Sequence, residues 1–173
     1  MEKKLVVHIE KCVGCHTCEF VCAITHSTSK DPETIIQTGE KPGHRVFVET
    51  YGGRAVPVHC NHCKKAACMI ACPTHAIYRE DENGPVEFDV SRCIGCRMCV
   101  QACPFGVITM SADGRRVIKC DLCIERLAEG QEPACVVACP TKAVVFETEE
   151  EDNRSKRRRS AELIVTAQEE GQV

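Results

Sequence analysis

The sequence predicts an α+β protein built from short helices and short β-hairpins, and three observations support this fold class. The 173 residues include 16 cysteines, which fall into four groups of four. Asn-Gly and Asp-Gly turns lie between short apolar runs after two of these groups. Only 4% of the residues are aromatic, so side chains alone would fill a conventional core poorly. We therefore expect one domain or two small ones, with bound cofactors in the interior.

Charge and hydropathy exclude several classes of function. The chain has 22 basic and 25 acidic residues and a formal net charge of −3, so no basic field favours nucleic acid as a partner. The longest apolar runs, such as 5–7 and 136–138, are far too short for insertion into a membrane. No apolar signal region or twin arginine precedes Cys12, and we therefore expect a cytoplasmic protein.

The spacing of the cysteines indicates iron–sulfur clusters. Groups one and three read C-x2-C-x2-C-x3-C, the run in which three thiolates bind one [4Fe–4S] cluster and the fourth binds its neighbour. Groups two and four keep the last spacing and lengthen the middle one. A disulfide scaffold and structural zinc are the alternatives; the missing export signal opposes the first, and the close triplets oppose the second. Four [4Fe–4S] clusters are expected from Cys12, Cys15, Cys18 and Cys22; Cys60, Cys63, Cys68 and Cys72; Cys93, Cys96, Cys99 and Cys103; and Cys120, Cys123, Cys135 and Cys139.

Strands are predicted around each cysteine group. Asn83-Gly84 and Asp113-Gly114 mark two hairpins, and Gly52-Gly53 marks a third. Strand, cysteine turn, short helix and strand therefore repeat four times along the chain, which gives two halves with two clusters each. In chain order the expected strands are 5–9, 45–48, 55–58, 76–78, 86–88, 107–110, 117–118 and 143–146.

A short helix is predicted at the end of each group. The last two cysteines of every group are four residues apart, so both lie on one side of a helical turn. Proline follows Cys72, Cys103 and Cys139 and ends the helix there, whereas alanine follows Cys22. Residues 26–44 contain two prolines and two glycines and are expected to form an inserted loop.

Several motifs around the cysteines are shared with one family. They are residues 12–22 with His26-Ser27 beyond them, C-N-H-C at 60–63, C-I-G-C at 93–96, C-P-F-G at 103–106, K-C-D-L-C at 119–123, P-A-C at 133–135 and C-P-T at 139–141. With these motifs, residues 5–147 resemble the four-cluster ferredoxin-like electron-transfer subunits of formate-hydrogenlyase, hydrogenase, formate dehydrogenase and carbon monoxide dehydrogenase systems. Residues 26–30 and 157–159 are most similar to the ferredoxin-like partner of carbon monoxide dehydrogenase.

The resemblance implies two interleaved halves of the bacterial-ferredoxin type, each with two [4Fe–4S] clusters. Residues 1–52 and 110–147 would hold groups one and four, residues 53–109 would hold groups two and three, and residues 148–173 would be a charged tail. The ligand sets implied by the family are Cys12, Cys15, Cys18 and Cys139; Cys120, Cys123, Cys135 and Cys22; Cys60, Cys63, Cys68 and Cys103; and Cys93, Cys96, Cys99 and Cys72. No ligand position departs from the family pattern.

The resemblance further implies an electron-transfer protein without catalytic residues of its own. It would relay electrons to or from a low-potential redox enzyme, with carbon monoxide dehydrogenase the favoured partner and a hydrogenase or formate dehydrogenase the alternative. A freely diffusing polyferredoxin is a second hypothesis. An iron–sulfur sensor is a third, which the absence of any recognisable effector segment disfavours.

Other residues have two interpretations each. Cations close to the cysteines are candidates for raising cluster potentials, or they keep the surface soluble: Lys64, Lys65, Arg97, Arg116 and Lys119. Three histidines lie close to cysteines but are surplus as ligands: His16, His59 and His62. Asp121 and Glu125 are expected to be surface charges. The tail is acidic at 147–152, basic at 156–159 and apolar at 163–165, and is either a solvated end or an arm that docks on a partner.

Overall fold

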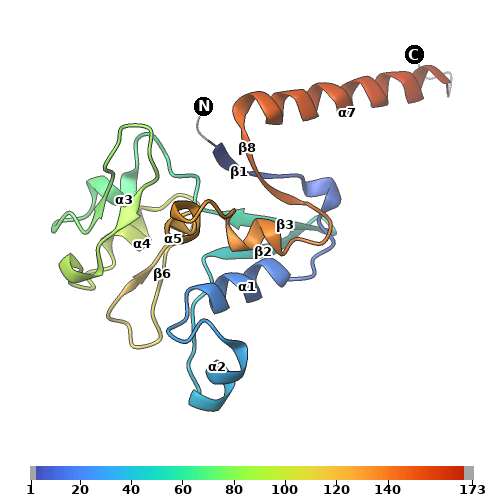
Figure 1. Ribbon diagram of the computed structural model, residues 1–173. Helices are drawn as coiled ribbons and strands as arrows, with labels where there is room; N and C mark the ends of the chain where they lie inside the picture. The colour runs from blue at the N-terminus through green and yellow to red at the C-terminus, as the bar shows by residue number, and fades with distance from the viewer. Residues whose placement is uncertain (1–2, 170–173) are drawn as a thin grey trace.

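Every β-sheet in the computed structural model, which describes residues 3–169, is a two-stranded antiparallel pair. These pairs and the short helices between them confirm the α+β class (Figure 1). Three of the pairs are the predicted hairpins, and the fourth joins the first strand to the last. The pairs are β1 (Lys3–Val7) with β8 (Val144–Thr148), β2 (Val46–Tyr51) with β3 (Arg54–His59), β4 (Ile77–Tyr78) with β5 (Glu87–Phe88), and β6 (Thr109–Met110) with β7 (Val117–Ile118).

Proline sets the lengths of the helices that carry cysteines. Helices α3 (Ala67–Ile70), α4 (Met98–Ala102) and α6 (Ala134–Val137) all stop before a Cys-Pro pair. Helix α1 (Thr17–Thr25) has no such proline and continues past its last cysteine to nine residues. The remaining short elements are η1 (Ile9–Lys11), η2 (Val90–Arg92) and α5 (Ile124–Ala128).

Two separate cores hold the cysteine groups. Groups one and four share one core, since β1 pairs with β8 and α1 packs against α6. Groups two and three share the other, where α3 packs against α4. In Figure 1, α3, α4 and β6 lie on one side of the molecule and α1, β2 and β3 on the other, with α5 between them. Buried members are Cys18, Cys22, Val46, Cys135, Val136 and Val144 in the first core, and Ala66, Cys68, Cys72, Ala76, Ile77, Val86, Cys99, Ile108 and Val117 in the second.

The two predicted boundaries between the halves, at residues 52/53 and 109/110, each fall inside a hairpin. The β2–β3 hairpin spans position 53, and both its strands lie with the first core: Val46 is buried there, and Pro57 lines a hollow with Cys12. The β6–β7 hairpin spans position 110, and Val117 lies in the second core. Strand pairing keeps each hairpin whole, so the change from one half to the other falls after β3 and after β7.

The inserted segment 26–44 is not only a loop, because it contains helix α2 (Pro32–Thr38). The Asp31 carboxylate caps the helix by accepting a hydrogen bond from the backbone N–H of Thr34, and Pro32 occupies the first turn. Gly39 ends the helix in the left-handed conformation. These are ordinary helix start and stop signals, and the sequence interpretation missed them because the helix is short.

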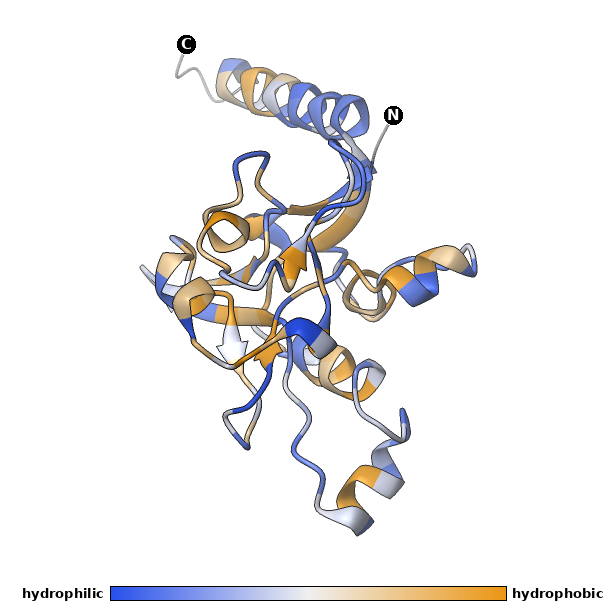
Figure 2. Cartoon of the chain, turned by 90° about the vertical axis from the view of Figure 1, so that its left-hand side faces the viewer, coloured by the Kyte–Doolittle hydropathy of each residue, from blue (hydrophilic) through white to orange (hydrophobic). Residues whose placement is uncertain are grey.

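The tail forms a single helix, α7 (Glu149–Glu169), of 21 residues. Its first turns pack on β8 and β1, and Asp152 is buried there with Lys156 2.9 Å away. Arg159 makes an ion pair with Glu10. The helix is polar at its start and more apolar toward its far end, where Leu163, Ile164 and Val165 are exposed (Figure 2). Within residues 3–169, no helix combines the length and hydropathy needed to cross a membrane.

Candidate iron–sulfur sites

Three hollows in the protein are each lined by four cysteines. Each has about 300–340 Å³ of free space, part of it open to solvent, and each takes three cysteines from one group and one from the paired group. The remaining lining is mostly aliphatic side chains and proline. The cysteines are Cys12, Cys15, Cys18 and Cys139 in one hollow; Cys60, Cys63, Cys68 and Cys103 in the second; and Cys72, Cys93, Cys96 and Cys99 in the third.

The other four cysteines gather between α1, α5 and α6. Burial raises the pKa of Cys135 far above its usual value, and the charges of Cys120, Cys22 and Cys123, and of Cys18 from the adjacent hollow, raise it further. These charges act on Cys135 because the sulfur atoms are close together. Burial likewise raises the pKa of Cys120 to about 12. Three of the sets that the family resemblance implied therefore line hollows, and the fourth, which includes Cys22, stays a prediction that these charge interactions support.

The chemistry of these sites fits an iron–sulfur cluster. Burial raises the pKa of both Cys18 and Cys99 to about 11, so in the absence of a bound metal these thiols keep their protons at neutral pH. A metal ion reverses this preference, because a coordinated thiol is deprotonated. Four converging sulfur donors per site suit soft thiolate-binding metals, iron–sulfur clusters among them.

Backbone N–H groups point at several of the sulfur atoms. Arg45 N–H lies 3.3 Å from Cys22 Sγ, His62 N–H lies 3.4 Å from Cys60 Sγ, and Ala143 N–H lies 3.2 Å from Cys139 Sγ. Such donors stabilise negative charge on sulfur and so favour thiolate ligands and the reduced state of a cluster.

Glycine is required inside two of the C-x-x-C turns. Gly14 and Gly95 both have φ of +68°, a conformation that other residues adopt at a cost. A Cβ atom on Gly95 would lie 3.2 Å from the carbonyl oxygen of Arg115. The C-x-x-C turn of Gly95 therefore depends on glycine for its conformation, and the missing side chain also lets the backbone at Arg115 approach closely.

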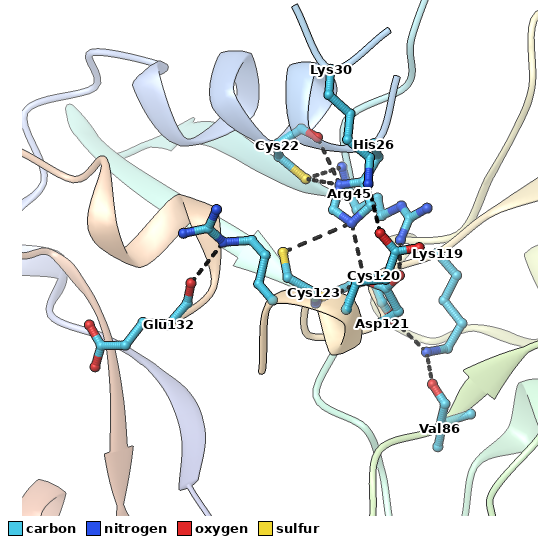
Figure 3. A network of polar contacts seen from close by, with 12 residues as sticks. Cys22, His26, Lys30, Arg45, Val86, Lys119, Cys120, Asp121, Cys123 and Glu132 are labelled. Carbon is cyan, nitrogen blue, oxygen red and sulfur yellow. Dashed lines mark hydrogen bonds and ion pairs between the residues drawn. The ribbon is translucent and has the colours of Figure 1, made fainter. Parts of the chain in front are cut away.

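A polar network that the sequence did not predict covers the site of Cys22 and Cys123 (Figure 3). His26 donates from Nδ1 to the carbonyl of Cys22 at 2.8 Å, and its Nε2 lies 3.2 Å from Asp121 and 3.9 Å from Cys123 Sγ. Arg45 makes an ion pair with the same Asp121. Asp121 is thus a half-buried, paired carboxylate and not the surface charge that was expected.

The two ends of the inserted segment provide this network. His26 follows α1 and Arg45 precedes β2, so both ends of residues 26–45 are tied to group four through Asp121. A more exposed ion pair, Lys30 with Glu125, adds a second contact at 2.8 Å. Although burial opposes it, hydrogen bonding to Asp121 raises the pKa of His26 well above its usual range, so His26 is a cation beside these sulfur atoms.

Lys119 is the buried member of the five cations singled out in the sequence. Only 3% of its surface is exposed, whereas Lys64, Lys65, Arg97 and Arg116 are exposed. The Lys119 ammonium donates to the carbonyls of Cys120 at 2.7 Å and Val86 at 2.6 Å, as Figure 3 shows. Val86 lines the hollow of Cys60, so this cation lies between two cysteine sites, one from each half.

The three histidines considered as surplus ligands have other partners. His16 donates to Glu19 at 2.7 Å, and His59 donates to the carbonyl of Cys60 at 3.0 Å. His62 accepts from the backbone N–H of Val86 at 2.9 Å, and burial lowers its pKa to about 3, which keeps it neutral.

Comparison with known proteins finds relatives that are iron–sulfur proteins. Residues 53–149 match the model of the 4Fe-4S dicluster domain. The chain is 40% identical, over 147 residues, to an iron-sulfur protein of Rhodospirillum rubrum, with 78% of this chain and 76% of that protein covered. It is 41% identical, over 144 residues, to the electron transfer subunit of thiosulfate reductase from Salmonella typhi, with 82% and 74% covered. Identity to the iron-sulfur subunit of the nitrate-inducible formate dehydrogenase of Escherichia coli is 31% over 171 residues; this covers 91% of the chain but only 58% of that subunit.

Proposed function

Because this chain belongs to the 4Fe-4S dicluster domain family, we propose that it is an electron-transfer subunit that relays electrons through four [4Fe–4S] clusters to or from the catalytic subunit of an oxidoreductase. The observation that carries the proposal is the set of three hollows, each lined by four cysteines, together with the charge interactions that link Cys135 to Cys22, Cys120 and Cys123. When bound, each cluster takes up and gives back a single electron. The protein's own part is to hold the clusters, exclude water and adjust their charge environment.

The ligand sets we propose are those that share a site, so within each half the two groups exchange their fourth cysteine. Cys139 completes the set of group one and Cys22 completes that of group four. Cys103 completes the set of group two and Cys72 completes that of group three. This exchange makes each half a single unit, because neither of its clusters is complete without both groups.

The order of the four sites along the relay follows from the junction between the halves. Lys119 touches the backbone of Cys120 on one side and of Val86, beside the Cys60 site, on the other. The sites of Cys120 and Cys60 are therefore the inner pair. The sites of Cys12 and Cys93 become the two outer ones, where electrons enter and leave.

The partner enzyme is the finer part of the proposal. Relatives named as subunits of formate dehydrogenase and thiosulfate reductase favour a catalytic subunit of such an oxidoreductase. Carbon monoxide dehydrogenase stays a prediction from the resemblance of residues 26–30 and 157–159. The cytoplasmic location also stays a prediction, to be tested by cell fractionation.

Anaerobic capture of the native chain tests this function. We expect a catalytic redox subunit to co-purify, and its substrate to change the redox state of the clusters, followed by the visible absorption of the captured chain. Formate or carbon monoxide would reduce the clusters through its own dehydrogenase and bleach this absorption, whereas thiosulfate would reoxidise clusters that had first been reduced, so the three compounds distinguish the candidate partners. A fully loaded chain that captures no redox enzyme would contradict the subunit role and favour the free polyferredoxin.

A further inference from the structure

Two of the sixteen cysteines are exposed, and they lie at opposite ends of the relay. These are Cys15 and Cys96, one in each outer site. Both occupy the second cysteine position of a C-x-x-C turn, and the residue after the first cysteine is a large apolar one in each case: Val13 is 68% exposed and Ile94 is 67% exposed. We call the exposed surface around each of these two cysteines a port: the Cys15 port and the Cys96 port.

The port at Cys96 is surrounded by arginines. Arg97 follows Cys96 directly, and its guanidinium lies 3.3 Å from the Cβ position of Gly114. The turn that carries Arg115 and Arg116 therefore lies against the C-x-x-C turn, where the carbonyl of Arg115 also meets Gly95. In the centre are two apolar side chains, Ile94 and the 47% exposed Met98.

These arginines are free of ion pairs. Among residues 3–169, no carboxylate lies within 4 Å of the guanidinium of Arg97, Arg115 or Arg116. Asp113, the nearest acid in sequence, accepts from Ser111 and from the backbone N–H of Arg115, and its charge attracts Arg115 and Arg116 without forming an ion pair within 4 Å. Three unpaired cations at this port contrast with the net charge of the chain, which is −3 before any cluster adds its own negative charge.

The port at Cys15 has a different character. Its large exposed side chains, Val13 and Phe20, are apolar. Among the nearby charges, His16 pairs with Glu19 and Glu10 pairs with Arg159. Lys11, next to Cys12, and Lys142, next to the lining residue Thr141, are exposed and make no ion pair within residues 3–169, so this port carries lysines where the Cys96 port carries arginines. Its exposed apolar side chains suit a lasting contact with an apolar protein surface.

From the three arginines on these two adjacent turns we propose that the Cys96 port, defined as Ile94, Cys96, Arg97, Met98, Arg115 and Arg116, docks an acidic electron-carrier protein. The carrier is a small redox protein whose cofactor is surrounded by carboxylates, and the proposal rests on the electron-transfer function above. Unpaired arginines attract and orient such a surface, which speeds association, while the small apolar centre allows quick release. Electrons then pass between a mobile carrier at Cys96 and a catalytic subunit docked elsewhere on the chain.

A stopped-flow experiment tests the port directly. The loaded chain is mixed anaerobically with a reduced acidic two-[4Fe–4S] ferredoxin as the probe, and the rate of electron transfer is followed across ionic strength. We expect a second-order rate that falls steeply as salt rises, and a drop of at least tenfold at low salt in the triple variant Arg97→Glu, Arg115→Glu, Arg116→Glu. The charge-conserving variant with lysine at the three positions should keep most of the rate.

A matched control separates the port from overall charge. Lys41→Glu, Arg154→Glu, Arg157→Glu makes the same change in net charge at exposed positions away from both ports and should leave the rate within about twofold of the unmodified chain. A port variant that keeps its rate and salt dependence would overturn the proposal, as would a control variant that loses as much.

Reduction by dithionite separates this proposal from the function on which it depends. The port variants should reach the same extent of reduction as the unmodified chain, because a small reductant needs no docking. Normal reduction by dithionite with no port effect on the ferredoxin rate overturns the docking site alone. Failure of dithionite to reduce the loaded, unmodified chain overturns the electron-transfer function itself.

Discussion

At the scale of single residues, the exchange of the fourth cysteine between groups is the feature with the sharpest consequence. Cys22 lies on α1 with group one, yet its sulfur is among those of Cys120, Cys123 and Cys135. We expect Cys22→Ala to damage the cluster of group four, and Cys120→Ala to damage the same one. Low-temperature EPR of the reduced variants, compared with Cys12→Ala, measures which signal is lost. A Cys22→Ala spectrum identical to that of Cys12→Ala would show that ligation follows the groups in sequence.

Lys119 is the residue expected to raise cluster potentials. Its ammonium is buried beside Cys120 and Val86, so little solvent screens its charge. Replacing it with methionine keeps the length of the side chain and removes the charge, and the midpoint potentials of the two inner clusters should become more negative. The change also leaves two carbonyls without a donor, with a cost of about 1–3 kcal/mol in stability.

An EPR-monitored redox titration measures this effect, and Lys64→Met is the control. Lys64 is also next to a cysteine but is exposed, so its charge is screened and the midpoints should hardly move. Equal shifts in the two variants would mean that burial of Lys119 has no special part in setting the potentials.

Sequence alone could not tell that Lys119 is buried and Lys64 is exposed, because both are next to a cysteine. Only the packing of the two halves against each other buries Lys119. The same limit applies to Asp121. Its partners His26 and Arg45 lie 95 and 76 positions away in the chain, and no local pattern joins them. The spacing within each group, together with the family resemblance, predicts which cysteines share a site, and three of these predicted sets line hollows.

At the scale of elements, local signals predicted most of the fold. The Cys-Pro pairs end three helices where expected, and the Gly-containing turns give the three hairpins. Helix α2 was missed although Asp31 and Gly39 cap it, since a short polar helix has little hydrophobic periodicity. The pairing of β1 with β8 is a contact between the two ends of the cysteine region and follows from the family topology rather than from any local signal.

Helix α7 carries a prediction of its own. Its far half presents Leu163, Ile164 and Val165 to solvent, with Arg157 and Arg158 exposed nearer to the body of the protein. Deleting residues 154–173 should weaken binding of the catalytic partner while leaving the absorption and EPR spectra of the clusters intact, because the deleted residues include no cysteine. Binding is measured anaerobically by biolayer interferometry with the captured enzyme. Unchanged affinity would leave the helix without a part in docking.

At the scale of the whole molecule, the chain is a scaffold of two small cores around four sites of sulfur atoms. Few aromatic residues are needed because the cysteine sites occupy the space between α1 and α6 and between α3 and α4. Buried thiols with raised pKa values keep their protons until a metal displaces them, so cluster binding is coupled to the release of these protons. The fold and the clusters are therefore expected to form together.

The content of iron and acid-labile sulfide per chain tests the central claim most directly. Four cubane clusters predict about sixteen iron and sixteen sulfide in the anaerobically purified chain, with no stoichiometric zinc. The concentration of protein must come from quantitative amino-acid analysis, since the clusters absorb in the near ultraviolet and the chain has no tryptophan. A plateau near eight iron and eight sulfide after complete reconstitution, or zinc in place of iron, would contradict the four-cluster relay.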